Sequence, residues 1–248
     1  MEIIGLITAR SGSKRIPGKN RKIFCGKPLI EWTFECIKNS KAVTNWIVST
    51  DDKKIIELSK DYPVRAPFIR PAELATDDAT SFDVVKHCLN WLLNNENYQP
   101  DWIILLEPTS PTRLSFHIDE VAEILHRKSK HIDSICGVSK ARGCSSAYKA
   151  LKVNKKNFLI PYNDNKTFSE ISIRNQLVKP SYFINSLIYG FKVERILSKS
   201  TTDLWGNLVY SYYVDTKYVS DIDNIDDWVV AEAKMNYLIN NFARKLNG

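Results

Sequence analysis

The stretch IIGLITARSGSKRIPGKN, residues 3–20, decides the fold of this 248-residue chain. Its first part, Ile3 to Ala9, is an unbroken apolar run, which is typical of a parallel strand buried on both faces. A loop rich in Gly, Ser, Lys and Arg follows at once. Open α/β sheets bind ligands where the first strand gives way to such a loop. The stretch therefore predicts a parallel sheet with a binding site at the end of its first strand.

Strand and helix patterns alternate along the next hundred residues. Short apolar runs predict further strands over Trp46–Ser49, Trp102–Leu106 and Ser134–Val138. Helical periodicity is found over Pro28–Asn39, Lys53–Lys60, Asp83–Asn94 and His117–Lys128. This alternation predicts an α/β, Rossmann-like fold with a mostly parallel central sheet flanked by helices.

The alternation weakens after about residue 140. Residues 141–183 are polar and broken by Asn and Pro, and we interpret them as an inserted, hairpin-like arm for dimerisation. Strand character returns over Tyr182–Phe191, and Asp226–Arg244 has the spacing of an amphipathic helix. We therefore predict one α/β domain, made of residues 1–140 and 184–248, that the arm interrupts.

Composition excludes several classes of protein. With 44% hydrophobic residues the chain can bury a core, and it contains no apolar run long enough to cross a bilayer. Its first residues place charge after the apolar stretch, whereas a signal peptide needs charge before it. The five cysteines are odd in number, dispersed and without CxxC spacing. We therefore expect free thiols, a cytoplasmic location and no membrane partner.

The charge pattern predicts an anionic small-molecule ligand. The net charge is +7, and residues 10–27 contain seven Lys or Arg and no acid. A cluster of this kind repels itself and calls for counter-charge, although a basic surface turn without a ligand is the alternative. A basic stripe with interleaved aromatics is missing, so nucleic acid is not an expected partner.

The loop itself favours phosphate binding but is not a Walker A motif. The small residues Ser11, Gly12 and Ser13 let backbone N–H groups approach an anion closely. A Walker A loop has four residues between its glycines and Ser or Thr after its Lys. Here five residues separate Gly12 from Gly18, and Lys19 is followed by Asn20.

A second candidate site is Asp221-Ile-Asp223. In an extended segment, residues two apart share one face, so both carboxylates can reach one metal ion. Magnesium prefers oxygen ligands and often joins carboxylates to substrate phosphates. Asp226 and Asp227 have a structural explanation, because acids stabilise the first turn of a helix. The four histidines show no metal-ligand spacing, and we expect them on polar helix surfaces.

Six blocks of sequence, in order, resemble one family. They are ARSGSKRIPGKN at 9–20, GKPLIEWT at 26–33, VSTDD at 48–52, RPAELATDDATS at 70–81, PTSP at 108–111 and DIDNIDDW at 221–228. The chain is similar here to the CMP-N-acylneuraminate synthetases, nucleotidyltransferases that activate sialic acid and related nonulosonic acids with CTP. The resemblance implies CTP and an acidic sugar as substrates, Mg²⁺ as cofactor and a homodimer.

The resemblance also implies roles for individual residues. Lys19, Arg10 and Lys14 would be catalytic and hold the phosphates, and Asp221 and Asp223 would hold the metal. The nucleotide-binding residues would be Thr8, Ala9, Ser11, Gly12, Ser13, Asn20, Arg70 and Ser81. The sugar-binding residues would be Glu107, Arg174, Asn185, Tyr189 and Trp205. Two alternatives stay open: Arg70 paired with Glu73, and core packing for Tyr189 and Trp205.

Glu107 departs from the family pattern, in which Gln commonly precedes PTSP and bonds the acidic sugar. An ionised carboxylate only accepts hydrogen bonds, whereas an amide also donates them. We therefore expect a sugar other than N-acetylneuraminate, one that presents a hydroxyl or amine to Glu107. The alternatives are a neutral Glu107 or one pointed elsewhere.

Two alternative functions accompany this interpretation. One is a sugar nucleotidyltransferase for another substrate, such as an eight-carbon ulosonate; Asn20 after Gly-Lys, where those enzymes usually have Pro, argues against it. The other is a non-catalytic protein that binds nucleotides or nucleic acid, against which the Asp221 and Asp223 pair argues, since acids repel a polyanion unless a metal is bound.

Overall fold

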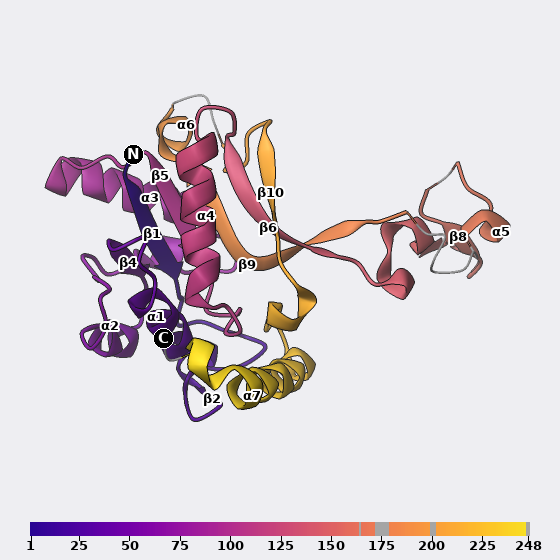
Figure 1. The fold of residues 1–248 in the computed structure, drawn as a ribbon, viewed down its shortest axis with the longest axis horizontal. Helices are drawn as coiled ribbons and strands as arrows, with labels where there is room; N and C mark the ends of the chain where they lie inside the picture. Colours follow the sequence, from indigo (N-terminus) through magenta and orange to yellow (C-terminus); the bar gives the residue numbers. More distant parts are fainter. Residues whose placement is uncertain (164, 172–178, 199–201, 247–248) are drawn as a thin grey trace.

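A mixed six-stranded sheet forms the centre of the protein, with strand order β10-β6-β9-β5-β1-β4 (Figure 1). The computed structural model describes residues 1–163, 165–171, 179–198 and 202–246, and only the backbone of 144 and 242–246. The strands are β1 (Ile3–Thr8), β4 (Trp46–Ser49), β5 (Trp102–Leu106), β6 (Ser134–Lys140), β9 (Tyr182–Lys192) and β10 (Val209–Tyr213).

Strand direction confirms a mostly parallel sheet and adds one exception. β1 pairs in parallel with β4 and β5, and β10 pairs in parallel with β6. β9 runs antiparallel between β5 and β6. The first strand therefore lies between two parallel neighbours, and its carboxyl end opens onto the loop at residues 9–20.

Helices cover both faces of the sheet, as predicted. Along β1, Ile7 belongs to the apolar cluster that contains α1 (Leu29–Lys38) and α4 (Ser115–Lys128). Ile4 and Leu6 belong to the opposite cluster, with α3 (Ser81–Glu96) and α6 (Val193–Leu197). The unbroken apolar run of β1 follows from this burial on two sides.

The helix α3 begins two residues before the predicted start at Asp83. The side chain of Thr80 accepts a hydrogen bond of 3.2 Å from the backbone N–H of Asp83, and the carboxylate of Asp83 bonds back to Thr80. This capping box satisfies N–H groups that the first turn leaves without helical partners. Ser81 is therefore the first residue of the helix.

A third apolar cluster attaches the C-terminal helix α7 (Ile225–Leu246) to the N-terminal loop. Ile16 of that loop and Phe24, which follows the loop, pack with Trp228 and Met235 of α7. Phe24 lies in a short hairpin of β2 (Ile23–Phe24) and β3 (Lys27–Pro28), and its ring meets that of Trp228 edge to face, with 5.3 Å between centroids. The two sequence ends of the domain thus meet beside the binding loop. The helix α2 (Lys53–Ser59), which follows β4, has the side chain of Asp52 as its cap.

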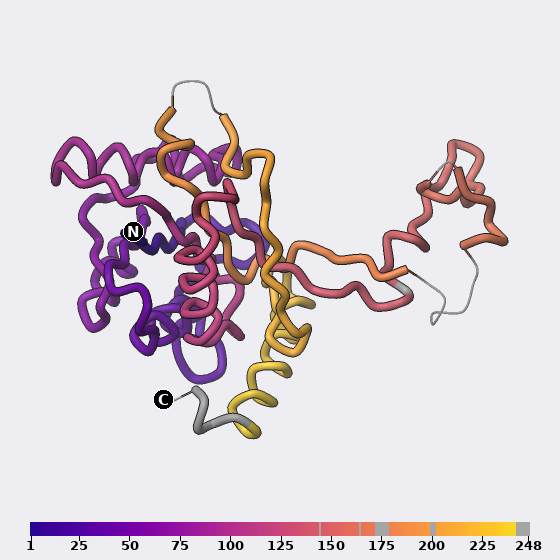
Figure 2. The backbone as a smooth tube through the Cα atoms, turned by 45° about the horizontal axis from the view of Figure 1, so that its top comes forward, coloured from indigo at the N-terminus to yellow at the C-terminus, as the bar shows by residue number. Residues whose placement is uncertain are grey.

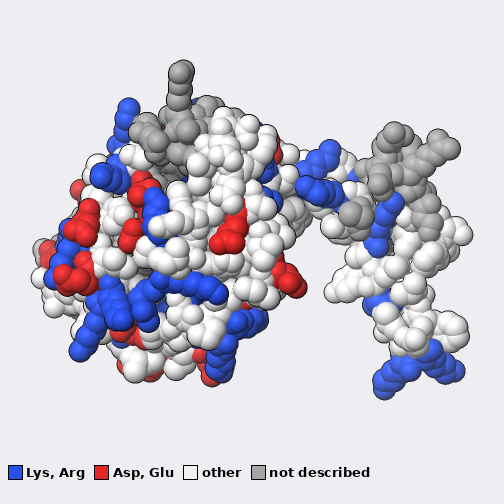
Figure 3. Space-filling view, turned by 90° about the horizontal axis from the view of Figure 1, so that it is seen from below, with Lys and Arg blue, Asp and Glu red and all other residues white. Residues whose placement is uncertain are grey.

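The segment 141–183 projects away from the body as an arm (Figures 1 and 2). Its neck is the paired outer ends of β6 and β9, where Ser139 faces Phe183. The arm contains a hairpin of β7 (Leu151–Val153) and β8 (Leu159–Pro161), followed by α5 (Phe168–Ile171). Lys and Arg side chains lie along it (Figure 3). Its role in dimerisation stays a prediction at this point.

One expectation about the histidines is wrong. His117 is buried, at 2% exposure, and its Nδ1 accepts a hydrogen bond of 3.0 Å from the backbone N–H of Leu114 at the start of α4. Burial lowers the pKa of the imidazole to about 3, so the ring is neutral. Its surroundings are the rings of Phe116, Tyr212 and Tyr218.

No helix in the described part of the chain is long and apolar enough to span a membrane.

Candidate active site

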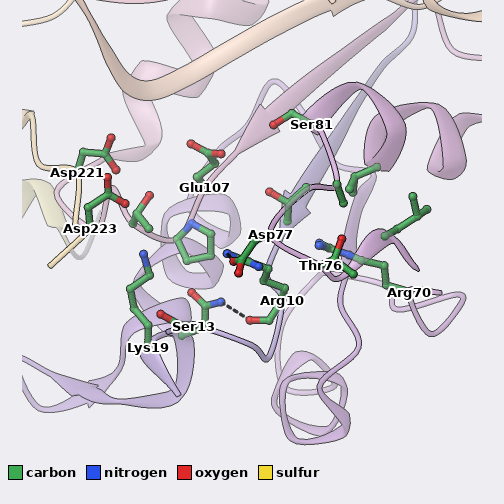
Figure 4. Close-up of a pocket in the computed structure, with 17 residues that line it drawn as sticks. Arg10, Ser13, Lys19, Arg70, Thr76, Asp77, Ser81, Glu107, Asp221 and Asp223 are labelled. Carbon is green, nitrogen blue, oxygen red and sulfur yellow. Dashed lines mark hydrogen bonds and ion pairs between the residues drawn. The ribbon is translucent and has the colours of Figure 1, made fainter. Parts of the chain in front are cut away.

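A pocket lies at the carboxyl ends of β1, β4 and β5, where the sequence predicts a binding site (Figure 4). Most of the predicted functional residues line it. They are Thr8, Arg10, Ser13, Lys19, Asn20, Arg70, Ser81, Glu107, Asp221 and Asp223. The pocket therefore joins residues separated by more than two hundred positions in the chain.

Lys19 links the N-terminal loop to the segment with the two aspartates. It lies in the short helix η1 (Lys19–Arg21), and its Nζ donates a hydrogen bond of 2.6 Å to the carbonyl of Ile222. Burial lowers the pKa of this ammonium, and the charges of Asp223, Asp221 and Glu107 oppose that effect. Lys19 lines the pocket with its ammonium, where it could donate hydrogen bonds to a phosphate, and a metal ion at the neighbouring carboxylates would offset their negative charge.

Arg10 and Lys14 meet at a carboxylate that the sequence did not predict. One carboxylate oxygen of Asp77 forms an ion pair with the guanidinium of Arg10, at 2.6 Å. The other oxygen forms an ion pair with the ammonium of Lys14. Asp77 lines the pocket, whereas Lys14 is 84% exposed at its rim. Asp77 was missed because it lies in a polar loop more than sixty residues from its partners.

Two predicted nucleotide-binding residues fix the shape of the loop. The side-chain amide of Asn20 donates a hydrogen bond of 3.0 Å to the carbonyl of Arg10, and Asn20 is nearly buried. The backbone N–H of Ser11 donates a hydrogen bond of 2.8 Å to one carboxylate oxygen of Asp51, and the Ser11 hydroxyl donates a hydrogen bond to the other oxygen. Of the described residues, Ser11, Gly12 and Ala9 are not in the pocket wall, so a contact between them and nucleotide stays a prediction.

Arg70 is anchored to the end of β4 rather than to Glu73. It is 5% exposed; its Nε donates 3.0 Å to the hydroxyl of Ser49, and its guanidinium also donates to the Ser49 carbonyl. Burial lowers its pKa to about 10, and the charge of Asp51 partly opposes this. Arg70 therefore lines the pocket as a buried, charged side chain.

Glu107 directly follows the last residue of β5 and faces the pocket (Figure 4). The backbone carbonyl of Glu107 accepts a hydrogen bond of 2.7 Å from the guanidinium of Arg113. Arg113 is buried and also donates a hydrogen bond of 2.6 Å to the carbonyl of Leu187. Burial and the charge of Asp221 raise the pKa of the Glu107 carboxyl to about 7. Arg113, just after the PTSP block, was missed, although a lone Arg beside an apolar helix start could have indicated it.

Asp221 and Asp223 face the same pocket, and their backbone is held by the start of α7. The N–H of Asp223 donates 3.0 Å to the carboxylate of Asp227, which also accepts from Asn224. Asp227 therefore has the structural role predicted for it. The Asp223 carboxylate is 3.3 Å from the guanidinium of Arg15.

The donor set fits Mg²⁺. Among the described residues no three His, Cys, Asp or Glu side chains form a metal cluster. Mg²⁺ does not need one, since it commonly takes one or two carboxylates and completes its shell with water and substrate phosphates. Asp221 and Asp223 offer two carboxylates in the pocket that Arg10 and Lys19 also line.

The predicted sugar-binding residues other than Glu107 are not in the described pocket wall. Asn185 is buried at an irregularity of β9, where its side chain donates 2.9 Å to the Ser139 hydroxyl and accepts from the N–H of Leu187. Trp205 packs edge to face on Tyr189 and Phe191. Burial raises the pKa of Tyr189, and the charge of Glu107 raises it as well, so the two side chains lie near one another. Arg174 lies outside the described residues.

Sequence comparison identifies the relatives of the chain. The profile of a family described as "Cytidylyltransferase" matches residues 4–215. The N-acylneuraminate cytidylyltransferase of Escherichia coli is 32% identical over 238 residues, 93% of this chain and 51% of the relative. The CMP-N,N'-diacetyllegionaminic acid synthase of Legionella pneumophila is 31% identical over 95% of this chain and 97% of the relative. Fold and site together define a nucleotidyltransferase. The chain belongs to the cytidylyltransferase family.

The relatives differ in how much of their own length this chain covers. The chain spans about half the length of the E. coli relative but nearly all of the Legionella relative. Among solved structures, a CMP:2-keto-3-deoxy-manno-octonic acid synthetase complexed with CTP superposes with a TM-score of 0.69 at 16% identity, covering 96% of this chain and 99% of the other. At that identity the match shows the fold alone.

Proposed function

We propose that this chain is a CTP-dependent cytidylyltransferase that activates an acidic nonulosonic sugar and releases pyrophosphate. The observation that carries the proposal is one pocket in which the phosphate-binding cations Arg10 and Lys19 face the carboxylates of Asp221 and Asp223. The relatives support the sugar class, because their names describe enzymes for N-acylneuraminate and for diacetyllegionaminic acid.

The proposed reaction is an in-line displacement at the α-phosphorus of CTP. The anomeric hydroxyl of a 2-keto sugar acid forms the new O–P bond, and the bond to pyrophosphate breaks. Lys19, Arg10 and Lys14 would bind the phosphates and neutralise the charge of the leaving pyrophosphate. Asp221 and Asp223 would hold Mg²⁺, which supplies further charge neutralisation when bound. Positioning and electrostatics supply most of the rate in such a reaction.

Thr8, Arg70 and Ser81 would form the nucleoside part of the site, since they line the pocket around the end of β1. Arg70 is fixed by Ser49 and does not need to reorganise when CTP binds. Ser81 is the first residue of α3, so its N–H lies at the positive end of a helix dipole. These features would let the pocket bind a compact base with polar edges.

The nature of the sugar depends on Glu107. With its pKa raised to about 7, the carboxyl is present in both forms near neutral pH: the ionised form only accepts hydrogen bonds, whereas the neutral form, the alternative named above, also donates one. We propose that the sugar presents a hydroxyl or amine to this side chain. Glu107→Gln should shift the relative kcat/KM among acidic sugars, and an unchanged ranking would remove the hypothesis.

The arm would form a homodimer. It exposes several large apolar side chains, among them Val153 at 59%, Phe158 at 65% and Leu159 at 55%. Apolar groups clustered on one projection mark an interaction site more often than a solvated surface. Sedimentation should give a dimer for the wild type and a monomer for the double variant Phe158→Ser, Leu159→Ser. Leu208→Ser, at a comparably exposed site on the body, should remain dimeric.

The test of the function is pyrophosphate release with Mg²⁺, crossing CTP, UTP, GTP and ATP against sialic, legionaminic, pseudaminic and eight-carbon ulosonic acids. We expect release with CTP and a nonulosonic acid. Release only with the eight-carbon acid would favour the first alternative function. Silence from folded protein that also fails to bind CTP would reject catalysis on these substrates.

A further inference from the structure

Asp77 occupies the position of an anionic ligand between two cations of the site. Its Oδ1 is 2.6 Å from the guanidinium of Arg10, and its Oδ2 pairs with the ammonium of Lys14. Figure 4 shows its carboxylate beside Arg10 on the pocket wall. Each carboxylate oxygen thus meets a different cation, which is how a bridging phosphate oxygen pair would bind them.

A polyphosphate bound at Arg10 and Lys14 would compete with Asp77 for these contacts. Hydrogen bonds from Lys14 and Arg10 lower the pKa of the Asp77 carboxyl, so it is ionised at neutral pH. An ionised carboxylate next to a polyphosphate is repelled by it, and both compete for the same N–H donors. Since Arg10, Lys14 and Asp77 are all partly exposed, the contact is weak enough to exchange.

The segment with Asp77 also forms part of the pocket wall. Thr76 and Ala79, on either side of Asp77, line the pocket, and the segment continues into α3 at Ser81. Movement of Asp77 away from the cations would therefore shift the wall beside the bound nucleotide.

We propose that Asp77 competes with the pyrophosphate moiety of the ligand for Arg10 and Lys14, and that its return to them promotes release of pyrophosphate. This inference rests on the proposed function for the identity of the nucleotide. Asp77 is displaced when CTP brings its terminal phosphates to the two cations, and it rebinds them as pyrophosphate leaves. No bond is made or broken by Asp77 itself.

The adjacent residue gives a matched control. Asp78 is exposed, and among the described residues it makes no ion pair and is not in the pocket wall. Asp77→Asn and Asp78→Asn change the charge equally, one residue apart. A difference between them therefore reports the contact with Arg10 and Lys14 and not the general electrostatic field.

The experiment is calorimetric titration of inorganic pyrophosphate, CTP and CMP into wild type and both variants in Mg²⁺-free buffer, with circular dichroism as a check on folding. Asp77→Asn should tighten pyrophosphate and CTP binding by roughly three- to tenfold, the worth of one or two exposed ion pairs. CMP binding and all binding to Asp78→Asn should change less than twofold. In turnover with Mg²⁺, Asp77→Asn should lower the Ki of pyrophosphate by a similar factor.

Three results would overturn the proposal. Weaker or unchanged pyrophosphate binding in Asp77→Asn would mean that Asp77 orients the cations or is irrelevant to them. Equal tightening in Asp78→Asn would assign the effect to net charge. Equal tightening of CMP would assign the competition to the α-phosphate. If the wild type binds pyrophosphate but not CTP, the proposed function fails, while the comparison of the two variants still decides the role of Asp77.

Discussion

The ammonium of Lys19 donates a hydrogen bond of 2.6 Å to the carbonyl of Ile222, the residue between Asp221 and Asp223. This bond joins the loop proposed to bind phosphate to the segment proposed to bind the metal. It also fixes a positive charge beside two carboxylates that would otherwise repel one another. The bond therefore holds the Lys19 ammonium and the two carboxylates on one side of the pocket.

Lys19→Ala should lower turnover by at least about a hundredfold, because a preorganised charge next to the leaving group is lost. The fold should persist, since the bond is to a backbone carbonyl at the edge of the pocket. The measurement is pyrophosphate release together with thermal unfolding. Lys22→Ala is the control: Lys22 lies over the ring of Trp228, outside the pocket wall, and this variant should keep most of its activity. Activity of Lys19→Ala within tenfold of wild type would contradict the role of Lys19.

Asp223→Asn should abolish turnover at ordinary Mg²⁺ concentrations, because one of two metal-binding carboxylates becomes a weaker neutral ligand. Asp226→Asn, three residues on in the first turn of α7, removes the same charge without touching the pocket. A Mg²⁺ titration of both variants is the measurement. If the two variants gave the same Mg²⁺ dependence, Asp223 would not be a metal ligand.

Glu107 should make the stability of the protein depend on pH. Its pKa is raised from 4.5 to about 7, so the folded state keeps a proton that the unfolded chain loses. The free energy of unfolding should therefore fall by about 1–3 kcal/mol as pH rises from 4.5 to 7 and then level off. Glu107→Gln should remove this fall and be more stable than wild type at pH 8.

Urea unfolding of Mg²⁺-free protein across this pH range would test that contribution. Glu123→Gln, at an exposed position on α4, is the control and should follow the wild-type profile. Parallel profiles for Glu107→Gln and wild type would show that the carboxyl at residue 107 titrates normally.

Two glycines should separate stability from binding. A Cβ on Gly5 would lie 1.9 Å from the ring of Trp46, so Gly5→Ala should destabilise the protein by about 3 kcal/mol. A Cβ on Gly12 would meet no heavy atom within 4 Å. Gly12→Ala should therefore keep its Tm and raise the KM for CTP, if the nucleotide approaches that backbone. Thermal unfolding and CTP kinetics on both variants check this, and an unchanged KM in Gly12→Ala would remove Gly12 from the nucleotide site.

Local patterns predicted most of the strands and helices because burial on two faces leaves a direct trace in the sequence. Trp46–Ser49 and Trp102–Leu106 are strands with the predicted bounds. The direction of β9 was not predictable, since an apolar run does not encode which way it enters a sheet. The strand β10, VYSYY, was missed because it is at the sheet edge, and three of its five residues are exposed, so its apolar pattern is incomplete.

The residues of the site likewise include some that the sequence predicts and some that it does not. Arg10, Lys19, Asp221 and Asp223 could be predicted because each lies in a block with its own chemical pattern. Asp77 was not predicted although it lies in the block at 70–81, because its role as an ion-pair partner appears only when two distant loops meet. Asn185 illustrates the reverse case: the resemblance implied a sugar-binding role for it, but its side chain bonds Ser139 and Leu187 within the neck of the arm.

The hydrogen bond between Lys19 and Ile222 spans 203 positions, and this has a consequence for biosynthesis. A ribosome-bound chain that has emerged only as far as β10 already contains every strand of the described sheet and the whole loop at residues 9–20. It still lacks Asp221 and Asp223, and it lacks α7, which packs on that loop through Trp228. Catalytic competence should therefore be acquired only after residues 221–223 and α7 have emerged, so that nascent chains shorter than this would not consume nucleotide in the cell.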